Sequence, residues 1–342
     1  MPHPVANPPN PWLTTHVEYF EDVPVARLEV FEEDARTIVS RNDSPDLPFR
    51  WSVNPYRGCY HGCAYCYARP SHEHLDWGAG TDFERKIVVK RNAPELLRAA
   101  FRARSWKGEV LAFSGVTDCY QPLEAAYALT RRCLEVCLEH RNPVGVVTKG
   151  ALVARDAALL AELDAVAGAT VTISIPFIDD EGGRQIEPFA STISRRFAAL
   201  ERLRAAGVRA GVSVSPIIPG LNDSQIPAIL TRAREHGAQH AFMTMLRLPG
   251  PVLPVFTERL TAAVPLRARA VLSAIRDVRG GALNSSEFGA RMTGEGPRWR
   301  AIEQLFATHA RRLGFITDDE PARPARHAFR VPQAQRSLFD DD

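Results

Sequence analysis

The sequence predicts an α/β protein whose central part is a partial (β/α)6 barrel of the TIM type. Strand-like and helix-like segments alternate, with a strand about every thirty residues, as in right-handed βαβ units that build a parallel sheet. Six strands are expected, fewer than the eight of a closed barrel, although the periodicity alone also fits other α/β folds. With 342 residues and 45% hydrophobic content, the chain can bury a large core.

The composition divides the chain into four regions. Residues 1–48 start rich in proline and carry no sustained period, so an N-terminal arm is expected there. Residues 49–250 hold the partial barrel, and residues 251–318 carry helical patterns without clear strands, which indicates a C-terminal helical extension. Residues 319–342 lack periodicity and are expected to form a disordered tail.

The strands of the barrel are expected at short apolar runs, and the helices at segments with one apolar face. Pro94 in a first turn marks the start of one helix, and Gly207 is a typical C-cap residue at the end of another. The expected strands are residues 51–54, 110–114, 144–147, 171–175, 209–215 and 241–245. The expected helices are residues 94–104, 124–140, 155–167, 194–206 and 224–236, with 255–263, 265–279 and 297–313 in the extension.

Charge and hydropathy indicate a cytoplasmic protein without a membrane span. The N-terminus has no basic head followed by an apolar run, so no signal peptide is expected. The uncharged stretch of residues 165–178 is too short and too polar to cross a bilayer. The net charge of +2 argues neither for nor against a nucleic acid. Six cysteines in a cytoplasmic chain of this size are not expected to form a disulfide framework.

Three of these cysteines, Cys59, Cys63 and Cys66, fall within eight residues at the spacing C-x3-C-x2-C. Thiolates this close together are expected to be metal ligands. Structural zinc sites are normally closed by four protein ligands, whereas three cysteines can hold three irons of a [4Fe–4S] cluster and leave the fourth open. The alternative is a zinc-stabilised binding protein without catalysis, its metal site completed by His61 or His72.

Polar residues follow the carboxyl ends of the expected strands. In parallel sheets of this kind, the functional site lies at those ends. Loops are polar by default, so each residue alone also has a structural explanation. Their coincidence with the cysteine loop after the first strand favours one common site. These residues are Ser114 to Asp118, Thr148, Lys149, Ser174, Ser215, Pro216 and Arg247.

The C-x3-C-x2-C spacing, with an aromatic residue before the last cysteine, resembles the signature of the radical S-adenosylmethionine (radical SAM) enzymes. Other segments resemble the spore photoproduct lyase-like branch, whose members are often labelled DNA repair photolyases. Within it, the Thr-Asp-x-Tyr-Gln-Pro-x-Glu run of residues 117–124 is specific to one subgroup. The resemblance covers about residues 45–300 and includes residues 82–84, 147–149, 174–175, 187–188 and 216–222.

The resemblance implies a [4Fe–4S] cluster on Cys59, Cys63 and Cys66, with S-adenosylmethionine (SAM) on its open iron. One electron from the cluster, supplied by a reductant such as flavodoxin or ferredoxin, would cleave SAM to a 5′-deoxyadenosyl radical. A lysine is chemically suited to the SAM carboxylate. The implied SAM contacts are Tyr65 and Tyr67 beside the adenine and cluster, Ser114 at the amino group, and Lys149 and Ser174 at the carboxylate and ribose.

The resemblance also implies a nucleic acid substrate, damaged or modified DNA, with modification of RNA or a peptide as the alternative. The chain departs from the lyases at Ala112 and Phe113, where they carry a hydrogen-donating cysteine, so reversal of a thymine dimer is not implied. Residues 258–314 hold ten arginines against five acids, which fits a nucleic acid face or ordinary solvated helices. The expected catalytic residues are Asp118, Tyr120, Glu124 and Arg247, with Gln121 and Glu187 as further substrate contacts, although Glu124 fits a helix-start charge equally well.

The tail carries Gln335, Ser337, Leu338 and Phe339 in a run that resembles the Q-x-S/D-L-F motif for docking on the bacterial DNA sliding clamp. Leucine and phenylalanine would fill an apolar pocket while the glutamine hydrogen-bonds at its edge. The alternative is that these apolar side chains fold back onto the protein's own surface.

Overall fold

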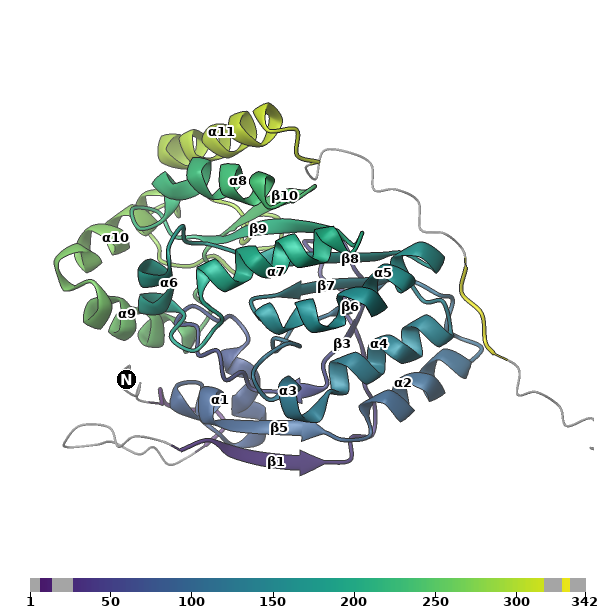
Figure 1. The fold of residues 1–342 in the computed structure, drawn as a ribbon. Coiled ribbons are helices and arrows are strands. Elements are labelled where there is room, and N and C mark those ends of the chain that lie inside the picture. The colour runs from purple at the N-terminus through teal and green to yellow at the C-terminus, as the bar shows by residue number, and fades with distance from the viewer. Residues whose placement is uncertain (1–6, 14–26, 317–327, 333–342) are drawn as a thin grey trace, which may run out of the picture.

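The computed structural model describes residues 7–13, 27–316 and 328–332, and the middle of the chain forms the expected α/β arrangement (Figure 1). The main sheet has seven strands in the order β10-β9-β8-β7-β6-β3-β2. All neighbours in it are parallel except β2 and β3. From β3 to β10 the order follows the chain, as successive βαβ units require. Among the described residues the sheet stays open, as a partial barrel requires. The predicted α/β fold class is therefore confirmed.

The expected strands and helices are present with shifted bounds. The parallel strands are β3 (Trp51–Val53), β6 (Leu111–Phe113), β7 (Val144–Thr148), β8 (Ala169–Ser174), β9 (Arg209–Ile217) and β10 (Ala241–Met245). The main connecting helices are α2 (Ala93–Arg102), α4 (Leu129–Glu139), α5 (Ala157–Val166), α7 (Ile193–Ala205) and α8 (Ile226–Glu235). Short segments add the 3₁₀ helices η2 (Ala151–Asp156) and η3 (Asp223–Gln225) and the helix α6 (Asp180–Ile186).

The helix expected over residues 124–140 is divided in two, α3 (Glu124–Tyr127) and α4. Ala128 between them has a φ of 51°, in the left-handed region, so the helical path stops there. The carboxylate of Glu124 accepts hydrogen bonds from the backbone N–H groups of Thr130 at 2.9 Å and Arg131 at 3.2 Å. These groups lie in the first turn of α4 and have no partner inside the helix, so Glu124 caps α4 across the break.

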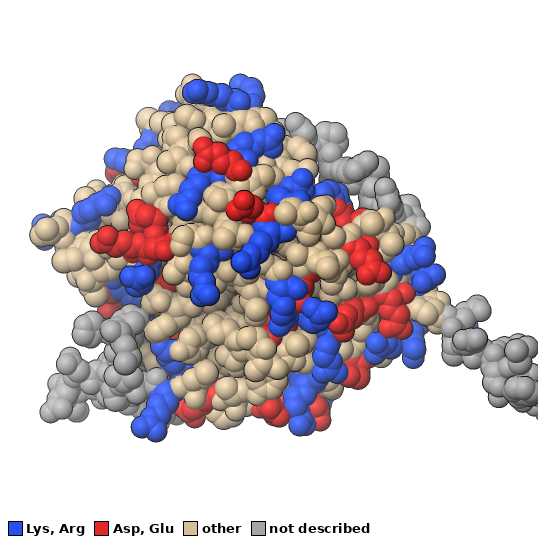
Figure 2. All heavy atoms as spheres, in the orientation of Figure 1, with Lys and Arg blue, Asp and Glu red and all other residues tan. Residues whose placement is uncertain are grey.

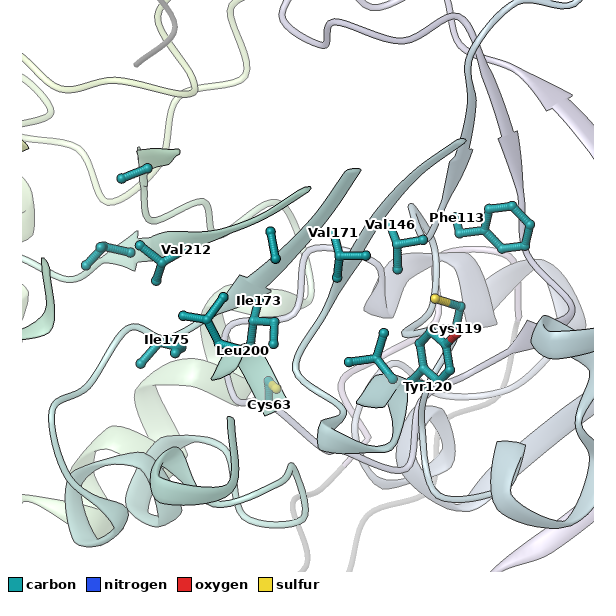
Figure 3. Packing of buried hydrophobic residues seen from close by; sticks show 14 of the residues in the cluster. Cys63, Phe113, Cys119, Tyr120, Val146, Val171, Ile173, Ile175, Leu200 and Val212 are labelled. Atoms are coloured by element: carbon teal, nitrogen blue, oxygen red, sulfur yellow. The ribbon is translucent and has the colours of Figure 1, made fainter. Parts of the chain in front are cut away.

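The strand register gives the main sheet two chemically different faces. Side chains of paired residues in neighbouring strands point to the same side of a sheet. One face carries apolar residues that pack in the core, and Figure 3 shows several of them, including Val146, Val171, Ile173 and Val212. Helix α7 contributes Leu200 to the same core. The other face carries mostly small and polar residues, with Val147 as an apolar exception: Ser52 pairs with Ala112, Ala112 with Gly145, Val147 with Thr172, Thr172 with Gly211 and Ser174 with Ser213.

The expected N-terminal arm contributes strands that the sequence pattern did not indicate. Strand β2 (Val39–Arg41) is the antiparallel edge of the main sheet, and β1 (Glu29–Glu33) joins a second, three-stranded sheet in the order β1-β5-β4. That sheet also holds β4 (Tyr56–Arg57) and β5 (Lys86–Lys90), which follows the short helix α1 (Thr81–Arg85). Strand β1 is mostly exposed, so its residues lack the apolar alternation that marks a half-buried strand.

The expected C-terminal extension consists of α9 (Val252–Ala263), α10 (Pro265–Asp277) and α11 (Gly296–Arg312). Figure 1 shows α11 beside α8 near β10, and α10 and α9 at the left, with α9 beside α6. Residues 328–332 pack near α2, where the centre of the Phe329 ring lies 5.9 Å from that of the Phe101 ring. Among the helices within the described ranges, none has the length and apolar character needed to span a bilayer. The clamp-like run at Gln335–Phe339 lies outside the described residues.

Candidate functional site

The cysteine loop, residues 58–67, follows β4 and lies beyond the carboxyl end of β3. Gly58 and Gly62 have φ values of 74° and 65°, so the loop makes two turns that favour glycine. Cys59 and Cys63 are 6% and 7% exposed and Cys66 is half-buried. All three are free thiols.

Burial raises the pKa of each of the three thiols and is the largest effect on each. The pKa of Cys59 is raised further by Asp118 and by the other two cysteines, so the three sulfurs lie close enough for their thiolates to repel one another. Among nearby cations, Lys149 lowers the pKa of Cys63 and Arg69 lowers that of Cys66. A metal that replaces the three protons would relieve this repulsion, because metal-bound cysteines are deprotonated.

The two histidines considered as zinc ligands have partners other than the thiols. The Nε2 atom of His72 lies 2.8 Å from the Lys86 carbonyl oxygen, and burial lowers the pKa of this imidazole to about 4. The Nδ1 atom of His61 lies 3.4 Å from a carboxylate oxygen of Asp118. Within the described part of the chain, no three His, Cys, Asp or Glu side chains are arranged around a single metal position. A four-iron cluster binds each cysteine through a separate iron, so its ligands need not converge on one point.

Residues 117–124, the Thr-Asp-x-Tyr-Gln-Pro-x-Glu run, support the first half of the cysteine loop. The Thr117 hydroxyl and the Gln121 side-chain amide both donate to the Gly58 carbonyl oxygen, at 2.5 and 3.2 Å. In return, the backbone N–H of Tyr60 donates to Gln121 Oε1 at 3.0 Å. Because these groups bond to the loop backbone, the segment fixes the path of the chain around Cys59.

Tyr120 and Glu124, both expected as catalytic residues, are buried at 1% and 0% exposure and bond to other protein groups. Glu124 accepts hydrogen bonds from the Tyr56 hydroxyl at 2.5 Å and the Arg155 guanidinium at 2.8 Å. The Tyr120 hydroxyl donates to the Asp156 carboxylate at 3.1 Å. With these partners, both side chains connect the loop to its supporting helices, and neither reaches the surface.

Asp118, the third expected catalytic residue, connects the cysteine loop to the end of β7. Its carboxylate accepts hydrogen bonds from the Thr148 hydroxyl at 2.5 Å and from the backbone N–H of Lys149 at 2.7 Å. Burial would raise the pKa of Asp118, but His61 and these hydrogen bonds together lower it well below the usual range. The ionised carboxylate therefore holds the Lys149 backbone and the His61 side chain in place.

Ser114, at the end of β6, has a strained backbone. Its φ of 102° is rare for a residue other than glycine, and such strain is typical of functional sites. The hydroxyl donates to the Val147 carbonyl oxygen at 2.6 Å and lies 3.4 Å from Cys119 Sγ. Ala112 and Phe113 precede this serine in β6, and the cysteine in contact with its hydroxyl is the fully buried Cys119.

Lys149, Tyr65 and Ser174, all expected SAM contacts, belong to one chain of interactions. The Lys149 ammonium lies 5.5 Å from the centre of the Tyr65 ring. The Tyr65 hydroxyl donates to Glu187, which pairs with Arg196 at 2.5 Å. The Arg196 guanidinium donates to the Ser174 carbonyl oxygen at 2.9 Å. This chain joins the cysteine loop to the ends of β7 and β8.

Arg247 follows β10, and its guanidinium carbon lies 5.6 Å from the centre of the Tyr67 ring. Its Nε atom is buried without a hydrogen-bond partner among the residues the structure covers. Burial lowers the pKa of Arg247, and the nearby Arg291 lowers it further. Arg291 pairs with Asp46 and lies 4.4 Å from the exposed Phe288 ring. Arg247 is therefore a desolvated cation suited to an anionic ligand.

The basic excess in residues 258–314 is smaller at the surface than in the sequence. Arg259 and Arg279 are only 8% exposed, and Arg298 pairs with Asp277 at 3.5 Å. On the face shown in Figure 2, basic and acidic side chains are intermixed. The expectation of a nucleic acid face on the extension stays a prediction.

Sequence reasoning missed four charged residues that surround the cysteine loop: Arg69, Glu84, Arg196 and Arg259. They come from different elements and are 0%, 1%, 1% and 8% exposed. Glu84 lies in one of the segments that carried the resemblance, residues 82–84, but that segment gave no sign of a buried charge. The spacing along the chain cannot reveal such pairs, because their partners are distant in sequence.

Comparison with known proteins gives three findings. The family model described as the radical SAM superfamily matches residues 53–233. An uncharacterized protein of Mycobacterium tuberculosis is 38% identical over 221 residues, which are 64% of this chain and 65% of that protein. An uncharacterized protein of Methanocaldococcus jannaschii is 29% identical over 198 residues, which are 58% of this chain and 71% of that protein. The chain therefore spans less than two thirds of the mycobacterial relative's length.

Among solved structures, spore photoproduct lyase complexed with dinucleoside spore photoproduct matches with a TM-score of 0.60 and 15% identity. The match covers 84% of this chain and 81% of the lyase. A mutant of that lyase with bound AdoMet and dinucleoside spore photoproduct matches with a TM-score of 0.58 and 15% identity. At this identity the similarity supports the fold.

Proposed function

The chain belongs to the radical SAM superfamily, and we propose that its cysteine loop holds a [4Fe–4S] cluster that leaves one iron open for SAM. Cys59, Cys63 and Cys66 would be the ligands. When bound, the cluster supplies the electron that cleaves SAM to a 5′-deoxyadenosyl radical. The observation that carries the proposal is the gathering of three free thiols, two buried and one half-buried, beyond the strand ends of a parallel sheet.

The residues around the thiols suit a ligand with cationic and anionic groups. The face of the sheet that continues to the strand ends carries small and polar residues, which leave room for such a ligand. We assign Lys149 to the SAM carboxylate, since its ammonium is held near Tyr65 and its backbone by Asp118. Ser114 and Ser174 would contact the amino group and the ribose, and Tyr65 would lie beside the adenine and the cluster.

The substrate side of the proposal rests on Arg247. The Nε atom of this partly buried cation has no hydrogen-bond partner within the described ranges, although Asp46 lies near enough to raise the pKa of Arg247, and the guanidinium lies beside a half-exposed tyrosine. Such a pair suits a phosphate with a neighbouring base, because arginine binds phosphate and aromatic rings stack on bases. We therefore propose a nucleic acid substrate, damaged or modified DNA. Asp118, Tyr120 and Glu124 would position the loop and the cofactor side.

We also propose that the tail docks on the DNA sliding clamp through Gln335, Ser337, Leu338 and Phe339. The support is the sequence motif, and a pull-down with purified clamp tests it. The full chain should retain the clamp, and the double substitution Leu338→Ala and Phe339→Ala should abolish retention. Lack of retention by the unaltered chain would remove this support for DNA.

Anaerobic reconstitution with iron and sulfide tests the cofactor proposal. The protein should become brown, take up about four irons per chain and form 5′-deoxyadenosine from SAM after reduction. A variant with all three loop cysteines replaced by alanine should do none of these. A colourless protein that binds a single zinc and leaves SAM intact would favour the zinc-stabilised binding protein instead.

A further inference from the structure

Three buried charged side chains form a connected group beside the second half of the cysteine loop. Glu84 in α1 pairs with Arg69 at 2.5 Å and with Arg259 at 2.8 Å. Arg69 is the first residue of the 3₁₀ helix η1 (Arg69–Leu75), three residues after Cys66, whereas Arg259 lies in α9 of the C-terminal extension. We call Arg69, Glu84 and Arg259 the charged triad. Within it, Glu84 and Arg259 are 175 residues apart in the chain.

The donors of the charged triad converge on the backbone of the cysteine loop. Arg69 donates to the carbonyl oxygens of Cys63 at 2.8 Å and Gly62 at 3.2 Å. Arg259 donates to the same Gly62 oxygen at 2.8 Å. Gly62 lets the triad approach, because a Cβ atom there would lie 3.0 Å from a carboxylate oxygen of Glu84. Both arginines therefore fix the peptide that leads into Cys63.

Packing alone does not explain a triad of this kind. A buried ion pair is weak support for stability, since apolar side chains of similar volume often serve as well or better. Here the arginines hydrogen-bond loop carbonyls as well as Glu84, so the arrangement selects one backbone path. Two guanidinium groups and one carboxylate also leave one positive charge beside the thiols. Positive charge there favours thiolates and the anionic cluster they would hold.

We propose that the charged triad is a positioning device for Cys63 and Cys66, and that it makes retention of the cluster depend on α9. The part that concerns retention of the cluster rests on the proposed function. The structural part, that the triad holds the loop closed, concerns the apo-protein alone. Residues 117–124 hold the Cys59 end of the loop separately, so loss of the triad should act on the Cys63 end.

Alkylation of the apo-protein tests the structural part. Full-length protein without iron is treated with iodoacetamide under native conditions, and the modification rate of each cysteine is measured by peptide mass spectrometry. Arg259→Ala should raise the rates of Cys63 and Cys66 about tenfold, the change expected from loss of about 1.4 kcal/mol of charge-assisted hydrogen bonding. Cys133 and Cys137, both 0% exposed in α4, report global unfolding and should change little.

Arg279→Ala is the matched control. Arg279 is also 8% exposed, also donates to backbone carbonyls, and does not contact the cysteine loop. It should lower stability by a similar amount without a selective effect on Cys63 and Cys66. Arg259→Lys keeps the charge with fewer donors and should give an intermediate rate. If α9 does not fold in the alanine variant, the lysine variant still provides the comparison.

Iron retention is the second readout. After reconstitution, Arg259→Ala and Glu84→Gln should lose iron to a chelator faster than Arg279→Ala. The variant that combines Arg259→Ala with Glu84→Gln should lose iron no faster than the faster of the two single variants. The triad proposal would be overturned if Arg259→Ala changed the alkylation rates of Cys63 and Cys66 by no more than those of Cys133 and Cys137. This outcome would count even in a protein that takes up iron. Failure of the unaltered protein to take up iron would overturn the proposed function and leave the alkylation result standing.

Discussion

Two tyrosines flank Cys66, and each lies close to a cation from a different strand end. Tyr65 faces Lys149 at 5.5 Å and Tyr67 faces Arg247 at 5.6 Å, so the two pairs are almost equal in distance. They differ in how they are held. Tyr65 is 6% exposed and hydrogen-bonds Glu187, whereas Tyr67 is 50% exposed.

The difference indicates a division of labour between the two sides of the loop. The Lys149 backbone is fixed by Asp118 and the Tyr65 ring by Glu187, so this side is preorganised for one ligand of constant shape. Arg247 has a buried Nε without a partner in the described residues, and its tyrosine is open to solvent. We assign the fixed side to SAM and the open side to the substrate, and the following predictions separate the two.

Cys66 lies between both pairs, so its loss should affect both sides and have the largest effect. Cys66→Ala removes one cluster ligand and should lower iron uptake and SAM cleavage at least about 100-fold. Iron analysis and quantification of 5′-deoxyadenosine give the measurement. Cys133→Ala, a buried thiol in α4, is the control and should leave both near their original values. Undiminished cleavage by Cys66→Ala would rule out a three-cysteine cluster.

Lys149→Ala should act on the fixed side alone. Loss of a charge-assisted contact of about 1.5–3 kcal/mol should weaken SAM binding about tenfold to a hundredfold. Isothermal titration of the reconstituted protein with SAM measures the change, and Lys149→Arg should recover part of it. Affinity for a single-stranded oligonucleotide should remain the same. A matching loss of oligonucleotide binding would show that the two sides are not separate.

Arg247→Ala should act on the open side alone. Loss of one phosphate contact should weaken binding of a fluorescein-labelled oligonucleotide about tenfold at low salt and reduce the salt slope by about 1. Fluorescence anisotropy measures both, and SAM affinity should stay within about twofold. The control is Arg300→Ala, because Arg300 is exposed on α11. An equal loss in the control would mean that binding depends on general charge.

The smallest effects should come from removal of one hydroxyl at each tyrosine. Tyr65→Phe takes a hydrogen bond from the buried Glu187 and should reduce the free energy of unfolding by about 1–2 kcal/mol. Tyr67→Phe should change it by less than about 0.5 kcal/mol, since that side chain is half exposed. Urea unfolding of both apo-variants gives the comparison. Equal destabilisation would contradict the difference between a fixed and an open side.

The sequence predicted the architecture well because parallel strands are short apolar runs and the helices between them carry clear apolar faces. It placed a cysteine loop and polar strand ends at the same edge, and the structure brings Lys149, Ser174 and Tyr65 into one chain of contacts. It missed β1 because an exposed strand has no apolar alternation.

The charged groups around the loop could not be predicted in the same way. Glu124 reads equally well as a catalytic acid or a helix-start charge, and only the fold shows it capping α4 and bonding to Tyr56. Arg259 stands in an arginine-rich stretch that suggested a nucleic acid face, yet its side chain is buried against Glu84. Buried pairs between distant residues leave no local pattern, so the structure is needed to separate them from surface charge.

The central claim is that three cysteines hold a cluster whose open iron binds SAM. Electron–nuclear double resonance on the reduced, reconstituted protein with SAM labelled by nitrogen-15 at its amino group tests it most directly. The account predicts a nitrogen coupling that shows direct contact between SAM and the cluster, and its absence from the Cys66→Ala variant. A reduced cluster whose spectrum does not change when SAM is added would contradict the account.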